Sequence, residues 1–251
     1  MIATETRGAV RVLSLDVPGK KNAISRAVCG ALLEALDSAA ADPGVGAVVI
    51  TGAGGTFCAG GDFDDMGGKD LTGWRDHFDH IARLPRRLAG FPKPVVAAVE
   101  GWAVGAGLGL ACLCDLIVAA GDARLAYGFD RVGVLPDLAL IHTLPLRVGP
   151  VRARQIMIWG EGFDAAAAQA IGLADRVAPA DGALDMAVDL AGQAAATAPL
   201  PVSYLKDYLA HGIDRALGFE RDCAAVLFTT DDHREGVQAF RERRVPAFTG
   251  R

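Results

Sequence analysis

A glycine-rich stretch between two apolar segments, Pro94–Asp115, constrains the fold more than any other part of this sequence. The run Pro94–Val99 is short and apolar and begins at a helix breaker, which is typical of a buried strand. Leu108–Cys114 is apolar but poor in β-branched residues, which favours a helix. The sequence therefore predicts a strand-to-helix turn over Gly101–Gly107. Its N–H groups would lie at a positive helix end, where they can hold a negative oxygen.

A second turn of this kind is expected after the apolar run Ala47–Thr51, where several glycines precede acidic residues that suit a helix start. Glycines in such turns can simply let a helix pack closely on a sheet, or they can expose main-chain N–H groups to a ligand. Two turns that each present one donor to the same carbonyl oxygen would stabilise the charge that appears when a thioester becomes an enolate.

Five segments together resemble the crotonase (enoyl-CoA hydratase/isomerase) superfamily. The two glycine turns carry the strongest matches, TFCAGGDFDDM at 56–66 and KPVVAAVEGWAVGAGLGLACLCDLIVA at 93–119. Shorter matches are KKNAIS at 20–25, GLADRVAP at 172–179 and EGVQAFRERRVPAFTGR at 235–251. The resemblance covers nearly the whole chain and implies an α/β fold, a spiral of repeated ββα units.

The same resemblance implies how the chain is divided and how it assembles. Residues 1–195 would form the core with the CoA-thioester site, and residues 196–251 a helical region that packs on the core and on neighbouring subunits. A homotrimer or a dimer of trimers is expected. The amphipathic face of the last helices, with Leu217, Ala224, Leu227 and Phe228, would look the same if it only filled a core within one chain.

Composition limits the class of protein further. A chain of 251 residues with 51% hydrophobic and 22% charged residues suits one large globular core. A net charge of −5 disfavours nucleic acid, whose binding needs a clustered basic face. The longest uncharged runs fall short of the roughly 20 residues that span a bilayer, and the polar N-terminus does not resemble a signal peptide. We therefore predict a cytoplasmic protein that binds neither nucleic acid nor membrane.

The five cysteines show no paired spacing, so neither disulfides nor a metal site is expected. Cys58 lies in the first glycine turn and has two interpretations. It can act as a nucleophile, or it can pack as a small residue, which the absence of a neighbouring histidine in the sequence favours.

By the resemblance, the two oxyanion donors are the N–H groups of Gly61 and Ala106, and the adenine end of coenzyme A lies along Lys21–Ala23 and Ala59–Phe63. Asp62 would brace its loop or cap a helix rather than catalyse. Coenzyme A belongs to the substrate, and no separate cofactor is implied. The residues expected to contact the thioester are Lys21, Asn22, Ala23, Ala59, Gly60, Asp62, Phe63, Trp102, Gly105, Gly109 and Phe129.

Hydratases of this superfamily use two glutamates, and both positions differ here. Aligned on the family motifs, the first position is Gly109 and the second is Phe129, neither of which can transfer a proton. One acid remains at a family position. Asp137 matches the carboxylate of peroxisomal-type Δ3,Δ2-enoyl-CoA isomerases, an acid of dienoyl-CoA isomerases and the nucleophile of 4-chlorobenzoyl-CoA dehalogenase. Asp137 can also be interpreted as the cap of a helix Leu138–Val148.

Three functions stay open from the sequence. A lone carboxylate suits proton shuttling by a double-bond isomerase, with apolar neighbours raising its pKa. The same carboxylate can act as nucleophile or water activator in hydrolysis or dehalogenation, for which a histidine base is expected. Loss of both glutamates also permits a catalytically silent acyl-CoA binder. Met66–Gly90 would border the acyl pocket, although His77 and His80 lie among charges that favour solvated side chains.

Periodicity and breakers predict the remaining elements. The strands are expected at Ala9–Val17, Ala47–Thr51, Leu116–Ala120 and Arg124–Tyr127, and the first two should pair in parallel. The helices are expected at Arg26–Ala41, Trp74–Leu88, Leu138–Val148, Val151–Trp159, Ala165–Ile171 with Asp164 as its cap, and through most of Asp181–Arg244.

Overall fold

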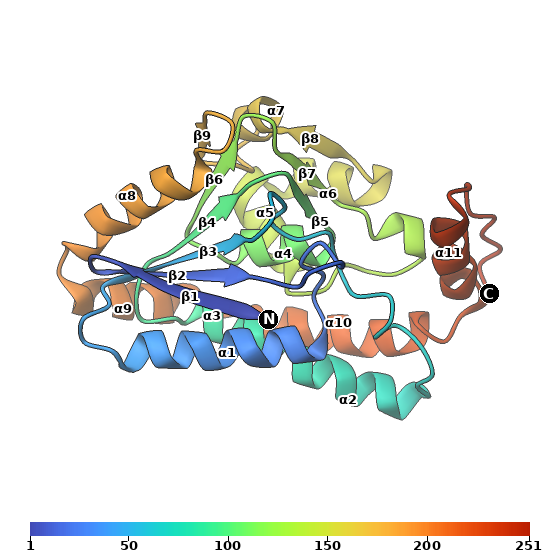
Figure 1. The fold of residues 1–251 in the computed structure, drawn as a ribbon. Helices are drawn as coiled ribbons and strands as arrows, with labels where there is room; N and C mark the ends of the chain where they lie inside the picture. The colour runs from blue at the N-terminus through green and yellow to red at the C-terminus, as the bar shows by residue number, and fades with distance from the viewer.

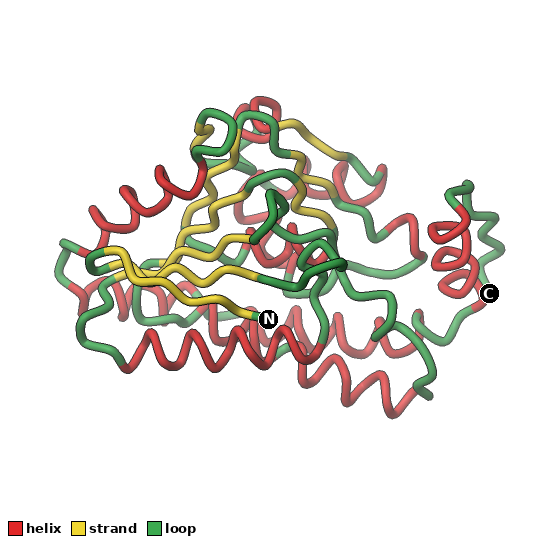
Figure 2. Tube along the Cα trace, in the orientation of Figure 1, coloured by secondary structure: helices red, strands yellow, loops and turns green.

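The computed structural model describes all residues from Met1 to Arg251. Figure 2 shows a central layer of strands with helices on both sides. The main sheet has the order β1-β2-β3-β4-β6-β9, with only β1 antiparallel to its neighbour. Its strands are β1 (Ile2–Arg7), β2 (Val10–Leu15), β3 (Ala47–Gly52), β4 (Val95–Val99), β6 (Leu116–Ala120) and β9 (Arg176–Ala178).

A second, smaller sheet joins β5 (Trp102–Val104), β7 (Arg124–Ala126) and β8 (Gly162–Asp164) in the order β5-β7-β8. The chain passes from β4 in the first sheet to β5 in the second and then into the helix α4 (Ala106–Cys112), which is one ββα unit of the expected kind. The prediction of a plain turn over Gly101–Gly107 is therefore wrong in part. The chain bends at Gly101 and at Gly105, and the strand β5 lies between these bends. A strand of three residues is too short to be recognised from the sequence pattern.

The helices surround the sheets as Figure 1 shows. They are α1 (Arg26–Ala41), α2 (Leu71–Ile81), α3 (Arg83–Ala89), α4, the 3₁₀ turn η1 (Asp130–Val132), α5 (Leu140–Val148), α6 (Pro150–Trp159), α7 (Ala165–Ala170), α8 (Ala183–Ala195), α9 (Pro199–Leu209), α10 (Ile213–Leu227) and α11 (Asp231–Glu242). None of them is long and apolar enough to cross a bilayer.

The strands β3 and β4 have almost entirely apolar sequences because both lie in the core of the protein. Every residue of both strands is buried, as expected for parallel strands covered on both faces. The helix α8 contacts β2, β3, β4 and β6, while α1 lies on the other side of the sheet with α2 and α3 in Figure 1. The predicted parallel pairing of β2 with β3 is confirmed. So are the bounds of α1, whose N-cap Ser25 accepts a hydrogen bond from the N–H of Val28.

The C-terminal helices pack within the chain and also leave apolar surface. Leu217, Ala224 and Phe228 are buried, and Phe228 lies 4.5 Å from the ring of Trp74 on α2. Several large apolar side chains on α9 stay exposed: Leu200, Tyr204, Leu205, Tyr208 and Leu209. The helix α11 lies at the edge of the molecule against η1 (Figure 1). The boundary between residues 195 and 196 stays a prediction.

The two glycine turns are joined by a main-chain seam between Cys58 and Ala103. Cys58 donates its N–H to the carbonyl of Trp102 at 2.9 Å, and Val104 donates to the carbonyl of Cys58 at 3.0 Å. On the same side, a Cβ at Gly107 would stand 2.4 Å from the carbonyl oxygen of Cys58. The helix α4 can therefore approach the first turn only because residue 107 has no side chain.

Replacement of Gly107 by alanine should cost about 1–3 kcal/mol of unfolding free energy, because the added methyl meets backbone that cannot move aside cheaply. Gly30→Ala in α1 is the control, since nothing lies within 4 Å of its Cβ position. Alanine there should be neutral or stabilise by about 0.4–1 kcal/mol. Urea unfolding of both variants measures the difference, and equal stabilities would contradict the close approach at Gly107.

Candidate active site

The two glycine turns open onto one cavity of about 360 Å³. Main chain from both turns, the side chain of Asp137 and apolar groups from the C-terminal helices line it. The predicted site residues among the lining are Ala59, Gly60, Gly61, Phe63, Trp102, Gly105, Ala106, Phe129 and Asp137. The structure thus brings together segments that lie far apart in the sequence.

Two main-chain donors face this cavity without a partner. The N–H of Gly61 and the N–H of Ala106 donate to no acceptor in the protein. Their neighbours are occupied, since Asp62 donates to the carbonyl of Ile24 at 2.7 Å and Gly105 to that of Ala126 at 3.1 Å. Ala106 is the first residue of α4, whose N–H has no partner within the helix. Both N–H groups are therefore free to donate to a ligand, and their role as oxyanion donors stays a prediction.

The backbone of both turns requires glycine next to each donor. Gly60 has φ of +118° and Gly105 has φ of +54°, in the region that side chains disfavour. Gly61 itself carries no strain of this kind, but a Cβ there would meet the methyl of Met66 at 2.3 Å. Gly60 and Gly105 are therefore needed for their backbone conformation, whereas Gly61 is needed because a side chain would not fit beside Met66.

Five predicted contact residues lie outside the cavity lining. Asn22 is buried and accepts a hydrogen bond from the N–H of Val17 at 3.0 Å, while its amide donates to two carbonyls of the first turn. Asp62 pairs with Lys20 at 2.7 Å, as expected of a bracing group. The remaining members of the group are Lys21, which accepts from the N–H of Ala59, buried Ala23, and Gly109. Their contacts with coenzyme A stay predictions.

Asp137 is the one carboxylate among the residues that line the cavity. Its Oδ1 is shielded from solvent and has no hydrogen-bond partner. Burial raises the pKa of this carboxyl to about 7, which outweighs the lowering by its own main-chain N–H. A carboxyl with this pKa can both accept and return a proton near neutral pH.

The interpretation of Asp137 as a helix cap is wrong. The helix α5 begins at Leu140 rather than Leu138, and its N-cap residue Ala139 receives no side-chain cap. The N–H of Ala139 instead donates to the carboxylate of Glu220 on α10 at 3.0 Å. Glu220 is a buried residue that the sequence analysis missed, because no local pattern connects it to a turn 81 positions away.

The two positions of the hydratase glutamates hold no acid, and the structure shows what occupies the space. A Cβ at Gly109 would lie 3.0 Å from the Cβ of Leu138 and 3.2 Å from the carbonyl of Asp137. The absence of a side chain at Gly109 therefore leaves room for the turn that carries Asp137. Phe129 lines the cavity and packs against Tyr127 at 5.2 Å between ring centroids.

His77 is buried, so the prediction of a solvated side chain is wrong. Its ring packs edge-on against Trp74 and Phe78 of the same helix, and it borders a cavity with residues of the first glycine turn, which the neighbouring sequence does not indicate. Burial lowers its pKa to about 4, and its Nδ1 has no partner. It borders a smaller cavity beside the first, together with Gly61, Ala106 and Asp137. His80 is half-buried, and burial lowers its pKa as well.

The thiol of Cys58 packs in the core. The side chain is fully buried, and burial raises its pKa to about 12, so it does not supply a thiolate near neutral pH. Its Sγ accepts a weak hydrogen bond from the N–H of Gly60 at 3.5 Å. This contact supports the structural interpretation, in which Cys58 holds the first turn.

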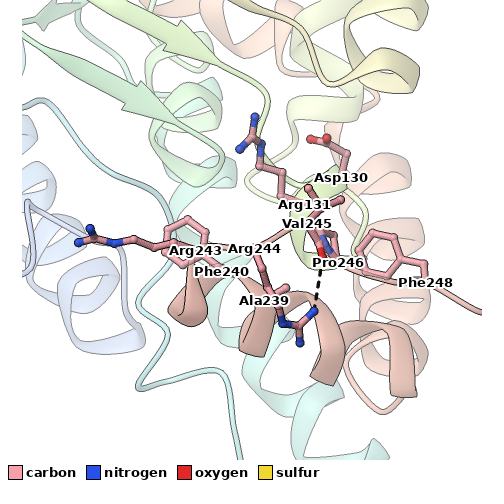
Figure 3. A pocket seen from close by; sticks show the side chains of 9 residues that line it. All are labelled: Asp130, Arg131, Ala239, Phe240, Arg243, Arg244, Val245, Pro246 and Phe248. Atoms are coloured by element: carbon pink, nitrogen blue, oxygen red, sulfur yellow. Dashed lines mark hydrogen bonds between the residues drawn. The ribbon is translucent and has the colours of Figure 1, made fainter.

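An outer cleft of about 790 Å³ adjoins the cavity, and Figure 3 shows the side chains that line this cleft. Arg131 and Phe240 line both spaces, and Arg243 lies in the outer one. Arg131 and Arg243 form no ion pair, whereas Arg244 in the same cleft pairs with Glu235 and Glu242. Two unpaired guanidinium groups therefore stand near the mouth, which the sequence analysis did not single out.

Two free main-chain donors, a carboxyl of raised pKa and a cavity between two glycine turns together form the candidate site. The chain belongs to the enoyl-CoA hydratase/isomerase family, whose model matches residues 5–251, and this confirms the crotonase superfamily. Enzymes of this family act on coenzyme A thioesters.

Individual relatives differ in their reactions. The chain is 36% identical over 246 residues to the 2,3-dehydroadipyl-CoA hydratase of Escherichia coli, covering 96% of each chain. It is 31% identical over 258 residues to the 1,2-epoxyphenylacetyl-CoA isomerase of the same organism, covering 100% of this chain and 98% of the relative. An enoyl-CoA hydratase structure from Mycobacterium avium subsp. paratuberculosis superposes with a TM-score of 0.88 at 30% identity, covering 99% and 98%. The α/β crotonase fold is thereby confirmed.

The raised pKa of Asp137 predicts a pH-dependent effect of Asp137→Asn on stability. The folded protein holds the Asp137 proton up to about pH 7, whereas the unfolded chain releases it near pH 4. Deprotonation of Asp137 therefore lowers the free energy of unfolding of the wild-type protein as the pH rises from about 4 to 7. Asparagine has no proton to lose, so the Asp137→Asn variant escapes this decrease. The variant should gain on the order of 2 kcal/mol at pH 8 over wild type, less than the full shift implies because the buried asparagine amide also loses its hydration.

Urea unfolding at pH 4.5 and pH 8 measures this gain, which should be nearly absent at the lower pH. Asp70→Asn is the matched control, because Asp70 is a surface N-cap of α2 that asparagine can replace. A gain of the same size at both pH values would contradict a raised pKa at Asp137.

Proposed function

We propose that this protein is an enoyl-CoA double-bond isomerase in which Asp137 is the single acid/base. The observation that carries the proposal is that Asp137 supplies the one carboxylate lining the cavity that also receives the free N–H groups of Gly61 and Ala106. Gly109 and Phe129 leave no second acid to hold a water for addition to a double bond. One group that accepts and returns a proton suffices for an isomerase.

The proposed reaction moves one proton and one double bond. The thioester oxygen of a 3-enoyl-CoA accepts hydrogen bonds from Gly61 and Ala106, which makes the α-hydrogen more acidic. The Asp137 carboxylate takes that proton, the C–H electron pair enters the conjugated dienolate, and the oxygen carries the charge. Asp137 then returns the proton to the γ-carbon, the double bond forms between the α- and β-carbons, and the carboxylate is restored.

The coenzyme A part of the substrate is proposed to bind to positively charged side chains at the mouth of the cavity. The unpaired guanidinium groups of Arg131 and Arg243 in the outer cleft suit the phosphates of the nucleotide end. Coenzyme A enters as part of the substrate. No separate cofactor is needed for the proposed proton transfer, because the two N–H groups and one carboxyl supply what the step requires.

Hydrolysis at the same site is the second candidate, and one observation favours it. His77, held neutral by burial, borders the same small cavity as Asp137 and has a free Nδ1, so it can activate a water for attack on the thioester or on an acyl-enzyme. Release of free coenzyme A on incubation would identify this reaction. A catalytically silent acyl-CoA binder would bind a thioester and give neither product.

Asp137→Asn should reduce isomerisation of a 3-enoyl-CoA by about 10²–10⁴-fold, since asparagine is close in size but cannot accept the proton. Affinity for the thioester should persist, because the oxyanion donors are main-chain groups. The conjugated product can be followed by absorbance in deuterated water, and mass spectrometry then locates deuterium at the α- and γ-carbons. Asp70→Asn serves as control. A fully active Asp137→Asn protein would exclude Asp137 as the acid/base.

We also propose that the chain forms a homotrimer or a dimer of trimers through its C-terminal region. The exposed apolar side chains of α9 support this, because a contiguous apolar helix face marks an interaction surface. Tyr204 and Tyr208 stand one turn apart and are 74% and 72% exposed.

Replacement of both Tyr204 and Tyr208 by lysine should lower the mass in solution, as measured by light scattering, because two charges cannot be buried unpaired in an interface. Asp207→Lys on the same helix is the control for added charge outside the apolar face. Wild-type protein that is monomeric at micromolar concentration would contradict the assembly itself.

A further inference from the structure

A buried histidine that the proposed isomerisation does not use, His77 on α2, borders a small cavity beside the thioester cavity. Only 8% of His77 is exposed, and its Nδ1 is buried without a hydrogen-bond partner. Its ring packs edge-on against Trp74 and Phe78, at 5.4 and 5.2 Å between centroids, so apolar contacts hold the ring in place. A phenylalanine would make similar contacts without burying an unpaired nitrogen. The histidine at this position therefore needs a further reason.

This small cavity, the side cavity, has a volume of about 30 Å³. It shares part of its lining with the thioester cavity, namely Gly61, Met66, Ala106, Asp137 and Phe228. One water-sized group needs about 10–15 Å³ on this measure, so the side cavity has room for roughly two such groups. An acyl chain held between the two main-chain donors and Asp137 can therefore place one short substituent in the side cavity.

The charges around the side cavity favour an uncharged substituent. No lysine or arginine borders it, and its aspartates other than Asp137 pair with lysines outside it, Asp62 with Lys20 at 2.7 Å and Asp65 with Lys69 at 3.4 Å. Burial lowers the pKa of the His77 ring to about 4, so the ring is neutral near neutral pH. An anionic substituent would meet carboxylates and no free cation, and any ion would lose its hydration beside a neutral ring.

We propose that the side cavity is a subsite for a hydroxyl group on the acyl chain, with Nδ1 of His77 as the hydrogen-bond partner of that hydroxyl. The inference rests on the proposed isomerase function, in which His77 takes no part in proton transfer. A hydroxyl can donate to Nδ1 or accept from it, so it pairs with either tautomer of the neutral ring. A carbonyl group can only accept, and a methyl group leaves the nitrogen unpaired. His77 thus selects among acyl chains.

The chemistry of the proposed reaction sets the position of this hydroxyl. The α- and γ-carbons exchange the proton, and the β-carbon carries the double bond before and after the shift. A hydroxyl on the γ-carbon of a 3-enoyl thioester would be an enol, which converts to a ketone. The δ-carbon is therefore the first position beyond the reacting carbons that can carry a stable hydroxyl. The substrate class of the subsite is a δ-hydroxylated 3-enoyl-CoA.

Binding of inert, saturated thioesters tests the subsite without turnover. Titration calorimetry compares the enantiomers of 5-hydroxyhexanoyl-CoA with 5-methylhexanoyl-CoA, in which a methyl group replaces the hydroxyl on the δ-carbon. Wild-type protein should bind one enantiomer about tenfold more tightly than the methyl compound, because a hydrogen bond to a buried, otherwise unpaired nitrogen contributes roughly this much.

Variants of α2 assign the preference to one side chain. His77→Phe should abolish it, whereas His77→Asn keeps a polar atom close to the position of Nδ1 and should retain part of it. His80→Phe is the matched control, because His80 borders an open surface hollow instead of the side cavity. This control should keep the tenfold preference of wild type. An unchanged preference in folded His77→Phe overturns the proposal.

Nitrogen NMR of protein labelled with ¹⁵N-histidine locates the contact. The Nδ1 resonance that His77→Phe removes should shift further with 5-hydroxyhexanoyl-CoA than with 5-methylhexanoyl-CoA. Equal affinity of wild type for these two thioesters overturns the proposal, even if no variant folds. Tighter binding of the charged 5-aminohexanoyl-CoA or 5-carboxyhexanoyl-CoA also overturns it. Wild-type protein that does not isomerise 5-hydroxy-3-hexenoyl-CoA or 3-hexenoyl-CoA refutes the proposed function, while the binding preference still decides whether the subsite exists.

Discussion

The seam of main-chain hydrogen bonds between Cys58 and the strand β5 is the constraint on which the site depends. It fixes the distance between two turns that come from different ββα units, and it leaves the N–H groups of Gly61 and Ala106 facing the same cavity. Backbone donors held in this way need no reorganisation when charge develops on a bound oxygen. Gly107 is required for the same reason, because any side chain there would push α4 away from Cys58.

Desolvation gives the site its chemistry. The cavity surrounds Asp137 with Phe129, Val134 and Phe228, and this apolar lining keeps its pKa near neutrality. Burial elsewhere keeps His77 neutral beside a smaller neighbouring cavity and the thiol of Cys58 protonated in the core. Desolvation thus makes the Cys58 thiol unreactive, while it leaves Asp137 able to exchange a proton near neutral pH.

Local patterns in the sequence predicted much of this arrangement. The bounds of helix α1 were predicted correctly because its apolar residues recur at helical spacing and Asp42-Pro43-Gly44 ends it. The strand β1 was missed because most of its residues are exposed, so it shows no buried face. The roles of Glu220 and Phe228 depend on α10 packing against residues far earlier in the chain, and no local periodicity encodes such a contact. The prediction of a solvated His77 was wrong because its helix packs beside the first glycine turn, a contact that the charges around it in the sequence do not encode. Cellular location and coenzyme A contacts of Lys21–Ala23 stay predictions.

The lining contributed by the last two helices has a consequence for biosynthesis. Phe228 and Phe240 close one side of the thioester cavity, and Glu220 supports the turn of Asp137. A ribosome releases these residues after both glycine turns have already emerged, and domains tend to acquire structure from the N-terminus as they emerge. Without the cover from these two helices, Asp137 would be hydrated and its pKa would lie near the ordinary value of a carboxyl. The environment that raises the pKa of Asp137 is therefore completed by the segments that the ribosome makes last, Phe228 and Phe240 among them.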